Sequence, residues 1–329
     1  MRIRGERVLV TGAAGFIGSH LVQQLLASGA HVRAFVRYHS MDALGCLNAL
    51  PGPQRAEIEV IKGELRDPHA VYQAMKGCDA VFHLGALIAI PYSYVHPADV
   101  VQTNVLGTLH VAQAAKDLSV SRLIHTSTSE VYGTARFVPM DESHPLQGQS
   151  PYSASKIAAD KIVESFIRSY GLPAITVRPF NAYGPRQSLR AVIPAIISQA
   201  LSQPEIVLGN LSATRDFTYV EDTARAFVSA AICEEGVGQV VNVGSGFEIS
   251  IADLTVKIKE LVGRDVPIRT DTQRVRPENS EVDRLFSDSN KASAVLGWRP
   301  QVSLEEGLRR TVQWMSENQH LYRDREYVL

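Results

Sequence analysis

Tyr152 and Lys156 are the residues of this sequence best suited to moving a proton. They are four positions apart, which places both side chains on one face of a helix, one turn from each other. A lysine ammonium beside a phenol favours the phenolate and so lowers the pKa of the tyrosine. Such a pair can remove the proton of an alcohol as a general base. We therefore predict that Tyr152 and Lys156 are catalytic.

A glycine-rich loop stands much earlier in the chain, directly after the first expected strand. In it, Gly12 allows a tight turn, Gly15 lets the backbone approach a pyrophosphate, and Gly18 lets helix and strand pack closely. The helix that follows offers free N–H groups to an anion. The sequence therefore predicts a dinucleotide site for NAD(P). Its loop residues are Gly12, Ala14, Gly15, Phe16, Ile17 and Gly18.

The end of the second expected strand bears on the choice between NAD and NADP. An acidic residue there would accept a hydrogen bond from the ribose 2′-OH of NAD. Residues 35–40 contain no acidic side chain, and Arg37 suits either stacking on adenine or facing a 2′-phosphate. The choice leans toward NADP or toward no preference, and it stays open.

Polar side chains follow the fifth expected strand. Thr128, Ser129 and Glu130 come just after residues 122–126. The carboxyl ends of parallel strands line the ligand crevice of an open sheet, so these groups should face the cofactor. A carboxylate at that place needs a partner or a task. We predict catalytic roles for all three residues, and no metal site.

Short β-rich runs alternate with segments of helical period in the first half of the chain. Such alternation favours an α/β fold, a doubly wound parallel Rossmann sheet with helices on both faces and right-handed crossovers. The expected strands are residues 8–10, 31–36, 58–61, 80–84, 122–126 and 174–178, and the expected helices are residues 19–28, 68–75, 104–118 and 153–170.

The pattern loosens after residue 178. Isolated helices are expected at residues 191–201, 251–261 and 304–316, within longer loops. We predict a dinucleotide-binding domain at 1–178 and a smaller C-terminal α/β substrate lobe at 179–329. The boundary is interleaved, because a segment at about 217–242 is expected to return to the large sheet.

The overall composition is that of an ordinary globular protein. Of 329 residues, 45% are apolar and 20% charged, which excludes a disordered chain. The net charge of −1 gives no basic excess for nucleic-acid binding. Apolar runs are too short for a membrane helix. Three scattered cysteines and no expected signal peptide point to a cytoplasmic enzyme.

These motifs together resemble the extended short-chain dehydrogenase/reductase superfamily, in its nucleotide-sugar epimerase and dehydratase branch. The resemblance runs in order along essentially the whole chain. The segments are TGAAGFIG at 11–18, HLGA at 83–86, NVLGT at 104–108, YSASK at 152–156, RPFNAYGPR at 178–186, RDFTYVED at 215–222, NVGSG at 242–246 and LGWRP at 296–300.

The fifth strand discriminates within this branch. Simple 4-epimerases have hydroxyls there but usually no Glu, and dTDP-glucose 4,6-dehydratases carry an Asp-Glu pair. Residues 127–130 are more similar to GDP-mannose 4,6-dehydratases, and Ser129 stands where an Asp would complete the pair. Residues 86–94, 141–152 and 276–282 resemble dehydratases of the legionaminic acid pathway, which act on GDP- or UDP-linked N-acetylglucosamine.

The resemblance implies further binding residues. Those for the cofactor are Arg37, Glu64, Leu65, Leu84, Ala86, Asn104, Thr126, Tyr152, Lys156 and Phe180. Those for the nucleotide-diphosphate sugar are Ile90, Asn181, Val192, Leu208, Arg215, Asn242, Arg276 and Glu278, with Asn181 at the diphosphate, Arg215 and Arg276 at phosphates, and Val192 and Leu208 at the base. Arg186 and Arg190 are weaker candidates.

The resemblance also implies a catalytic cycle. Tyr152 removes the C4 hydroxyl proton as hydride moves to the nicotinamide, Lys156 holds Tyr152 and the ribose, and Thr128 bonds the C4 hydroxyl. Glu130 then removes the C5 proton. The C6 hydroxyl leaves as water, protonated by Glu130 or through Ser129 or Thr128. Hydride returns to C6, so the cofactor stays tightly held and ends each cycle as it began.

Two other functions remain open. A 4-epimerase, a 5,6-dehydratase or a decarboxylase would share the C4 oxidation. A dinucleotide-binding regulator without turnover is more remote, because Tyr152, Lys156 and Glu130 are all present.

We also expect a homodimer built as a four-helix bundle. Two expected helices, 104–118 and 153–170, carry the apolar stripes for it. These are Val111, Ala112 and Ala115 on one helix, and Ile157, Ile162, Val163 and Phe166 on the other.

Overall fold

The fold is built on a parallel sheet, confirming the predicted Rossmann class. The computed structural model describes residues 2–38, 44–271 and 277–322. Seven strands pair in the order β10-β6-β5-β4-β1-β2-β3, all in parallel. They are β1 (Arg7–Thr11), β2 (His31–Arg37), β3 (Glu59–Gly63), β4 (Ala80–His83), β5 (Arg122–Thr126), β6 (Ala174–Pro179) and β10 (Val240–Val243). The strand order changes direction between β1 and β4, where doubly wound sheets bind their ligands.

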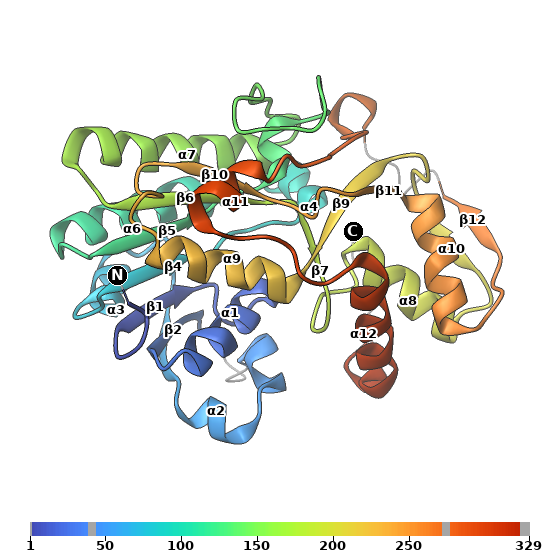
Figure 1. The fold of residues 1–329 in the computed structure, drawn as a ribbon, viewed down its shortest axis with the longest axis horizontal. Coiled ribbons are helices and arrows are strands. Elements are labelled where there is room, and N and C mark those ends of the chain that lie inside the picture. Colours follow the sequence, from blue (N-terminus) through green and yellow to red (C-terminus); the bar gives the residue numbers. More distant parts are fainter. Residues whose placement is uncertain (1, 39–43, 272–276, 323–329) are drawn as a thin grey trace.

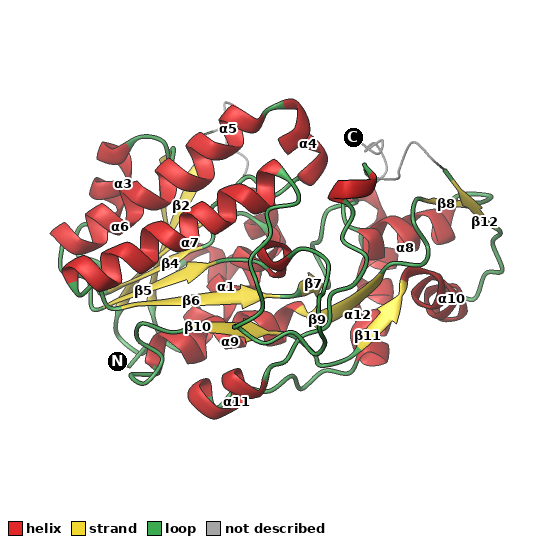
Figure 2. Ribbon diagram, turned by 90° about the horizontal axis from the view of Figure 1, so that it is seen from above, coloured by secondary structure: helices red, strands yellow, loops and turns green. Residues whose placement is uncertain are grey.

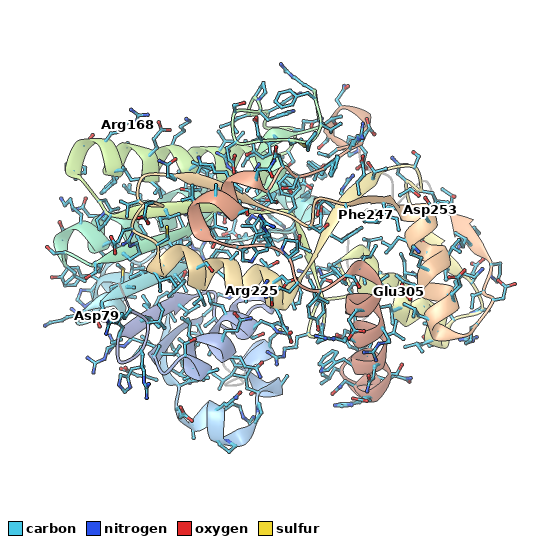
Figure 3. All side chains as sticks on the ribbon, viewed as in Figure 1. Asp79, Arg168, Arg225, Phe247, Asp253 and Glu305 are labelled. Carbon is cyan, nitrogen blue, oxygen red and sulfur yellow. The ribbon has the colours of Figure 1, made fainter. Side chains whose placement is uncertain are left out.

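Helices cover both faces of the sheet (Figures 1 and 2). Successive strand residues point to opposite faces: Val8 packs with Phe227 in one apolar core, and Leu9 with Val163 in the other. Figure 3 labels Arg168 and Arg225 on the two opposite layers. The first layer has α1 (Phe16–Ala27), α9 (Val220–Ile232) and α11 (Asn290–Leu296), and the second has α3 (Pro68–Met75), α6 (Gly107–Asp117) and α7 (Pro151–Tyr170).

A smaller set of strands and helices stands beyond the carboxyl ends of the large sheet (Figure 1). It has its own apolar core. The strands are β7 (Asn181–Tyr183), β9 (Thr214–Tyr219) and β11 (Glu248–Ser250) in one sheet, with β8 (Ile206–Leu208) and β12 (Ile268–Thr270) in another. The helices are α8 (Val192–Ser202), α10 (Ile251–Val262) and α12 (Leu304–Glu317). The predicted division at residue 178 stays a prediction, although α9 packs on the large sheet and β10 is one of its strands.

Short elements complete the described chain. They are η1 (Gly45–Ala49), α2 (Gly52–Ala56), α4 (Ile90–Val95), α5 (Pro97–Val101), η2 (Gln102–Leu106), η3 (Ser129–Tyr132), η5 (Glu278–Ser280) and η6 (Gln319–Leu321). The helix expected to begin at residue 104 begins earlier, because α5 continues through the π-helical turn η2 into α6. Such turns often mark functional sites, and Asn104 lies in this one.

Five of the seven residues named for the dimer interface are wrong predictions, while the partly exposed Ile157 and Ile162 stay predicted interface residues. Val111, Ala112, Ala115 and Val163 are fully buried within the chain, where they pack on the large sheet, and Phe166 lies in the same core. Ile157 and Ile162 are half-buried against apolar cores of this chain. An apolar helical stripe is equally suited to packing on a sheet or on a partner helix. Here the buried residues of the stripe pack on the sheet. The homodimer itself stays a prediction.

Among the described residues, no helix combines the length and apolar character needed to cross a membrane.

Trp298 attaches the C-terminal part of the chain to the large sheet. Its side chain is 1% exposed, and its indole N–H donates to the Asp222 carbonyl of α9 at 2.9 Å. It belongs to the core formed by α1, α9 and the sheet. A large aromatic side chain at this point therefore stabilises the contact between α11 and α9.

We expect Trp298→Ala to lower the free energy of unfolding by about 3–5 kcal/mol, because it leaves a large cavity and an unpaired carbonyl. Urea unfolding followed by far-UV circular dichroism measures this loss. An unchanged midpoint and slope would show that Trp298 does not hold these elements together.

Candidate active site

Tyr152 and Lys156 are placed by the first two turns of α7. Ser150 caps the helix, accepting a hydrogen bond from the Ser153 N–H, and the Ser153 hydroxyl interacts in return with the Ser150 N–H. This capping box fixes where the helix begins. Tyr152 and Lys156 then lie one turn apart with both side chains buried. The predicted pairing on one helix face is therefore present in the structure.

The carboxyl end of β5 meets this helix face. The Lys156 Nζ donates to the Thr126 carbonyl at 2.6 Å. Thr128 caps the turn η3, because its hydroxyl accepts from the Glu130 N–H at 3.2 Å. Ser129 is buried inside this turn, whereas Glu130 is partly exposed. The strand end thus brings the hydroxyl and carboxylate groups to the helix that carries Tyr152.

Burial sets the electrostatics of this pair. It raises the pKa of Tyr152 well above its ordinary value; the Glu130 and Asp160 carboxylates act in the same direction, and a hydrogen bond with Thr128 opposes them. Burial also lowers the pKa of Lys156 to about 8, opposed by the charge of Asp160. The expected lowering of the Tyr152 pKa is wrong for this arrangement, since desolvation of the phenolate is the largest effect on it.

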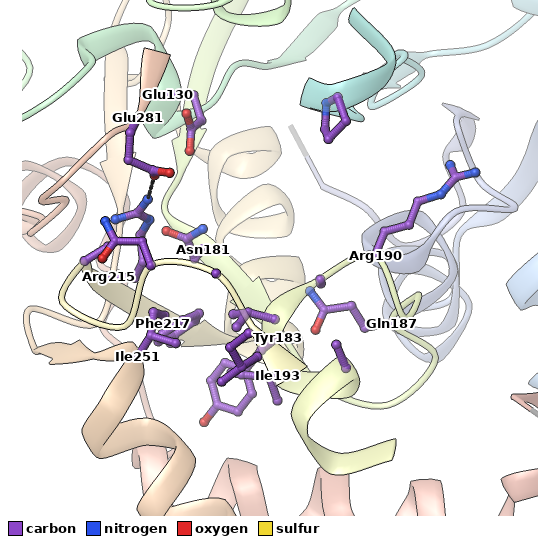
Figure 4. Close-up of a pocket in the computed structure, with 18 of the residues that line it drawn as sticks. Glu130, Asn181, Tyr183, Gln187, Arg190, Ile193, Arg215, Phe217, Ile251 and Glu281 are labelled. Atoms are coloured by element: carbon purple, nitrogen blue, oxygen red, sulfur yellow. Dashed lines mark hydrogen bonds and ion pairs between the residues drawn. The ribbon is translucent and has the colours of Figure 1, made fainter. Parts of the chain in front are cut away.

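A cavity of about 460 Å³ opens beside Glu130 (Figure 4). The Glu130 carboxylate points toward Asn181 of β7, while Arg190 stands on the other side. The Asn181 Oδ1 is buried without a hydrogen-bond partner among the described residues, so it is available to a ligand. Arg215 of β9 pairs with Glu281 at 3.4 Å in the same wall.

The substrate residues expected from the sequence divide into three groups. Those that line this cavity are Asn181, Val192, Leu208, Arg215 and the weaker candidate Arg190. Ile90 and Asn242 are not part of its lining, nor is Arg186, which bonds to Gln23. Arg276 and the side chain of Glu278 lie outside the described residues.

Asn242 corrects the sequence-based prediction. It is fully buried in β10, where its Nδ2 donates to the Met140 carbonyl and its Oδ1 accepts from the Tyr132 hydroxyl at 2.7 Å. Its backbone N–H donates to Glu142. Because these contacts occupy its side chain within the core, Asn242 is a structural residue and not a substrate contact.

A second cavity, of about 550 Å³, lies over the glycine loop. Gly12 has a φ of +69°, and an added Cβ would stand 2.8 Å from the Gly85 nitrogen. At Gly18 an added Cβ would overlap the Gly12 carbonyl oxygen. The helix α1 begins after Gly15 with no side chain capping it, so its first N–H groups are left for an anion. This loop fits the pyrophosphate of a dinucleotide.

Six of the predicted cofactor residues line this second cavity: Gly12, Ala14, Arg37, Glu64, Leu65 and Ala86. The remaining loop residues Gly15, Phe16, Ile17 and Gly18 form the start of α1 beside it. Leu84, Asn104, Thr126 and Phe180 are not part of its lining. Asn104 instead holds the backbone of Leu87 through both of its side-chain groups, and Phe180 packs in an apolar core with Tyr132.

Several lining residues were not identified from the sequence. Glu281, Tyr94 and Gln187 line the first cavity, and Asp99 and Thr103 line the second. Residues 276–282 carried part of the family resemblance, but only the fold brings Glu281 to Arg215. Tyr94 reaches the same wall through its hydroxyl, which lies 2.6 Å from that of Ser280.

Comparison with known proteins settles the family. A family model described as GDP-mannose 4,6 dehydratase matches residues 9–311. The chain belongs to this family. It is 32% identical to the mouse dTDP-D-glucose 4,6-dehydratase, over 98% of this chain and 92% of that protein. It is 36% identical to the UDP-glucose 4-epimerase of Mycolicibacterium smegmatis, over 94% of this chain and 98% of that protein.

Solved structures give the same result. The dTDP-glucose 4,6-dehydratase DesIV of Streptomyces venezuelae, solved with NAD bound, has a TM-score of 0.86 and 32% identity, with 96% of this chain and 99% of that chain covered. The UDP-N-acetylglucosamine 4-epimerase of Methanobrevibacter ruminantium has a TM-score of 0.87 and 31% identity, with 95% and 99% covered. The chain belongs to the nucleotide-sugar dehydratase and epimerase superfamily, of the extended short-chain dehydrogenase/reductase type, as its motifs indicated.

The glycine loop gives a matched pair of variants. We expect Gly18→Ala to destabilise the fold by about 1–3 kcal/mol and to weaken dinucleotide binding, because the new methyl group collides with backbone. Gly52→Ala should do neither, since nothing lies within 4 Å of its added Cβ. Thermal unfolding and calorimetric titration with NAD and NADP measure both effects. Equal behaviour of the two variants would contradict the role of Gly18.

Proposed function

We propose that this chain is a nucleotide-sugar 4,6-dehydratase that converts an NDP-N-acetylglucosamine to the 4-keto-6-deoxy sugar. The observation that carries the proposal is the Glu130 carboxylate at the end of β5, in a cavity that also holds Asn181 and Arg215. Oxidation at C4 needs no carboxylate, but removal of the C5 proton needs a base. The legionaminic acid pathway is the setting that the sequence motifs favour.

The chain's cofactor is NAD(P), and the choice between NAD and NADP is open. The glycine loop is proposed to hold its pyrophosphate, and Arg37 and Glu64, which line the second cavity, its adenosine end. Tyr152 and Lys156 line neither cavity and are proposed for its nicotinamide end from their place at the carboxyl end of β5. A bound nicotinamide would supply a reversible acceptor for hydride. Of the two solved structures described above, that of DesIV contains NAD.

Tyr152 is the group that we propose removes the C4 hydroxyl proton. Its pKa is raised by burial, so the phenolate needs support from its surroundings. The Thr128 hydroxyl gives part of that support, and the protonated Lys156 is held nearby through the Thr126 carbonyl. Below about pH 8 Lys156 keeps its proton, and above it the charge is lost. We therefore expect C4 oxidation to decline as the pH rises through about 8.

Glu130 is the group that we propose acts on C5. Once C4 is a ketone the C5 proton is acidic, and a partly exposed carboxylate at the cavity wall is a suitable general base. The leaving C6 hydroxyl takes a proton from Glu130 or, through a relay, from Ser129 or Thr128. Asn181 and Arg215 are proposed to hold the diphosphate, with Val192 and Leu208 against the base.

A 4-epimerase is the second candidate, because relatives of that activity are as similar to this chain as the dehydratases are. Both reactions begin with the same C4 oxidation. They differ in whether a base acts at C5, and Glu130 favours the dehydratase.

Heavy water separates the two. The protein is incubated with GDP- and UDP-N-acetylglucosamine in D₂O, and the products are examined for deuterium at C5. A dehydratase gives a C5-labelled sugar that has lost water. An unlabelled sugar with inverted C4 would establish the epimerase instead, and the nucleotide that reacts identifies the substrate.

Glu130→Gln keeps the shape of the side chain and removes its basicity. We expect the variant still to form the 4-keto hexose, but to lose water at least about 10²-fold more slowly, the low end of general-base effects. Glu281→Gln is the matched control from the same cavity, and it should alter substrate affinity more than water loss. Quenched samples analysed by mass separate ketone from product. Water loss at the wild-type rate in Glu130→Gln would refute the assignment.

Tyr152→Phe should stop the reaction one step earlier. The phenylalanine ring fills the same buried site but has no hydroxyl to accept the C4 proton. We expect at least about a 10²-fold fall in formation of the 4-keto hexose, with nucleotide-sugar binding retained in a calorimetric titration. Ketone formation at an unchanged rate would assign the first proton transfer to another group.

A further inference from the structure

Asp160 is a buried carboxylate on α7, one helical turn beyond Lys156 and two beyond Tyr152. Its side chain is 5% exposed. Four donors reach it: His125 Nε2 at 3.1 Å and Ser127 Oγ at 2.7 Å from the end of β5, with Arg178 Nε at 3.2 Å and Nη2 at 2.9 Å from β6. A buried carboxylate is stable only when such donors compensate it.

The partners of Asp160 stand on both sides of the contact that holds Lys156. His125 and Ser127 are the immediate neighbours of Thr126, whose carbonyl accepts from Lys156. Each neighbour bonds to a different carboxylate oxygen. Asp160 therefore fixes the end of β5 against α7 beside the carbonyl that binds the Lys156 ammonium.

Arg178 extends these contacts to the turn that carries Glu130. Its Nη1 donates to the Tyr132 hydroxyl at 3.0 Å, and that hydroxyl donates to Asn242 at 2.7 Å. Tyr132 is the last residue of η3 and is fully buried. The turn that presents Glu130 is thus tied to the same carboxylate as the contact of Lys156.

We propose that Asp160 and Arg178 are positioning residues that hold Lys156 and the Glu130 turn in one fixed arrangement. This inference rests on the proposed function, in which Tyr152 with Lys156 and then Glu130 act in sequence on one sugar. Neither positioning residue lines either cavity. Both act through the groups that they hold.

The charges around Lys156 give the proposal a second readout. On β4 and β5 the pKa values of His83 and His125 are lowered by burial, so both imidazoles are neutral near pH 7. Arg178 faces the site from β6, and Tyr152 from α7, while the Glu130 carboxylate approaches from η3. Asp160 is the negative group that favours a protonated Lys156. Without its charge Lys156 should lose its proton at lower pH.

Asp160→Asn tests whether Asp160 positions Lys156 and the Glu130 turn. It should slow both ketone formation and water loss by about tenfold or more, toward the roughly 10²-fold that a misplacement of about 1 Å costs. The alkaline decline of ketone formation should also move to lower pH. Asp222→Asn is the control, because Asp222 is an equally buried carboxylate on α9 that bonds to Arg225 and to the backbone of Gln301. It should lose stability with no change in the pH profile.

Tyr132→Phe tests the connection from Arg178 to the Glu130 turn with little change in the shape of the side chain. It cuts the link from Arg178 to the Glu130 turn and leaves Asp160 intact. Ketone formation should stay within about twofold of wild type, and water loss should slow by about tenfold or more. Slowing of both steps alike, or of neither, would overturn the connection to Glu130.

The outcomes separate the two proposals. A wild-type protein that forms no ketone overturns the proposed function and this inference with it. A wild-type protein that completes the reaction, with Asp160→Asn behaving as Asp222→Asn does, overturns the positioning role alone. Should Asp160→Asn fail to fold, Ser127→Ala removes a single bond to the same carboxylate. Because this variant keeps the charge of Asp160, it should slow ketone formation without moving the alkaline decline to lower pH, and an unchanged rate would count against the proposal.

Discussion

The meeting of β5 with the first turns of α7 is the constraint on which the site depends. A strand end and a helix start come from segments about thirty residues apart in sequence, and the bond from Lys156 to the Thr126 carbonyl joins them directly. Asp160 reinforces the junction from inside the protein. Buried polar groups of this kind contribute little net stability, but they penalise every arrangement in which a partner is missing. Precision at the site follows from that penalty.

Burial has two opposite consequences for the chemistry. It raises the pKa of Tyr152, which disfavours the phenolate, and it lowers the pKa of Lys156, which disfavours the ammonium. The same burial strengthens every compensating interaction, because charges act more strongly in a medium of low dielectric constant. Glu130 is placed differently, at a cavity wall with partial exposure. In the proposed reaction, one fold therefore gives a desolvated pair for the alcohol and an accessible carboxylate for the carbon acid.

Local spacing was enough to predict part of this site. The glycine loop, the Tyr152 and Lys156 pair, and Glu130 at a strand end all follow from short-range geometry, which the parallel sheet then brings together. Contacts between distant segments were not predictable in this way. Only the fold brings Glu281 to Arg215. Asn242 lies inside a family motif, but its side chain is hydrogen-bonded within the core to Tyr132 and to the Met140 carbonyl.

Five of the residues predicted for the dimer stripes were wrong for a related reason. A row of apolar residues such as Val111 and Ala115 records that a helix face is covered, and not what covers it. The pKa of Tyr152 likewise depends on how much protein surrounds the phenol, which spacing along a helix does not state. Sequence patterns thus identified the groups proposed to react, while their environment could be described only from the folded chain.

The fate of the hydrogen at C4 tests the account most directly. A substrate deuterated at C4 is mixed with a substrate that has no deuterium but carries heavy carbon, and the products are resolved by mass and by nuclear magnetic resonance. If hydride returns to C6 as proposed, each dehydrated sugar that lost deuterium from C4 carries it at C6 of the same molecule. Deuterium found again at C4, on a sugar that keeps its C6 hydroxyl, would contradict it.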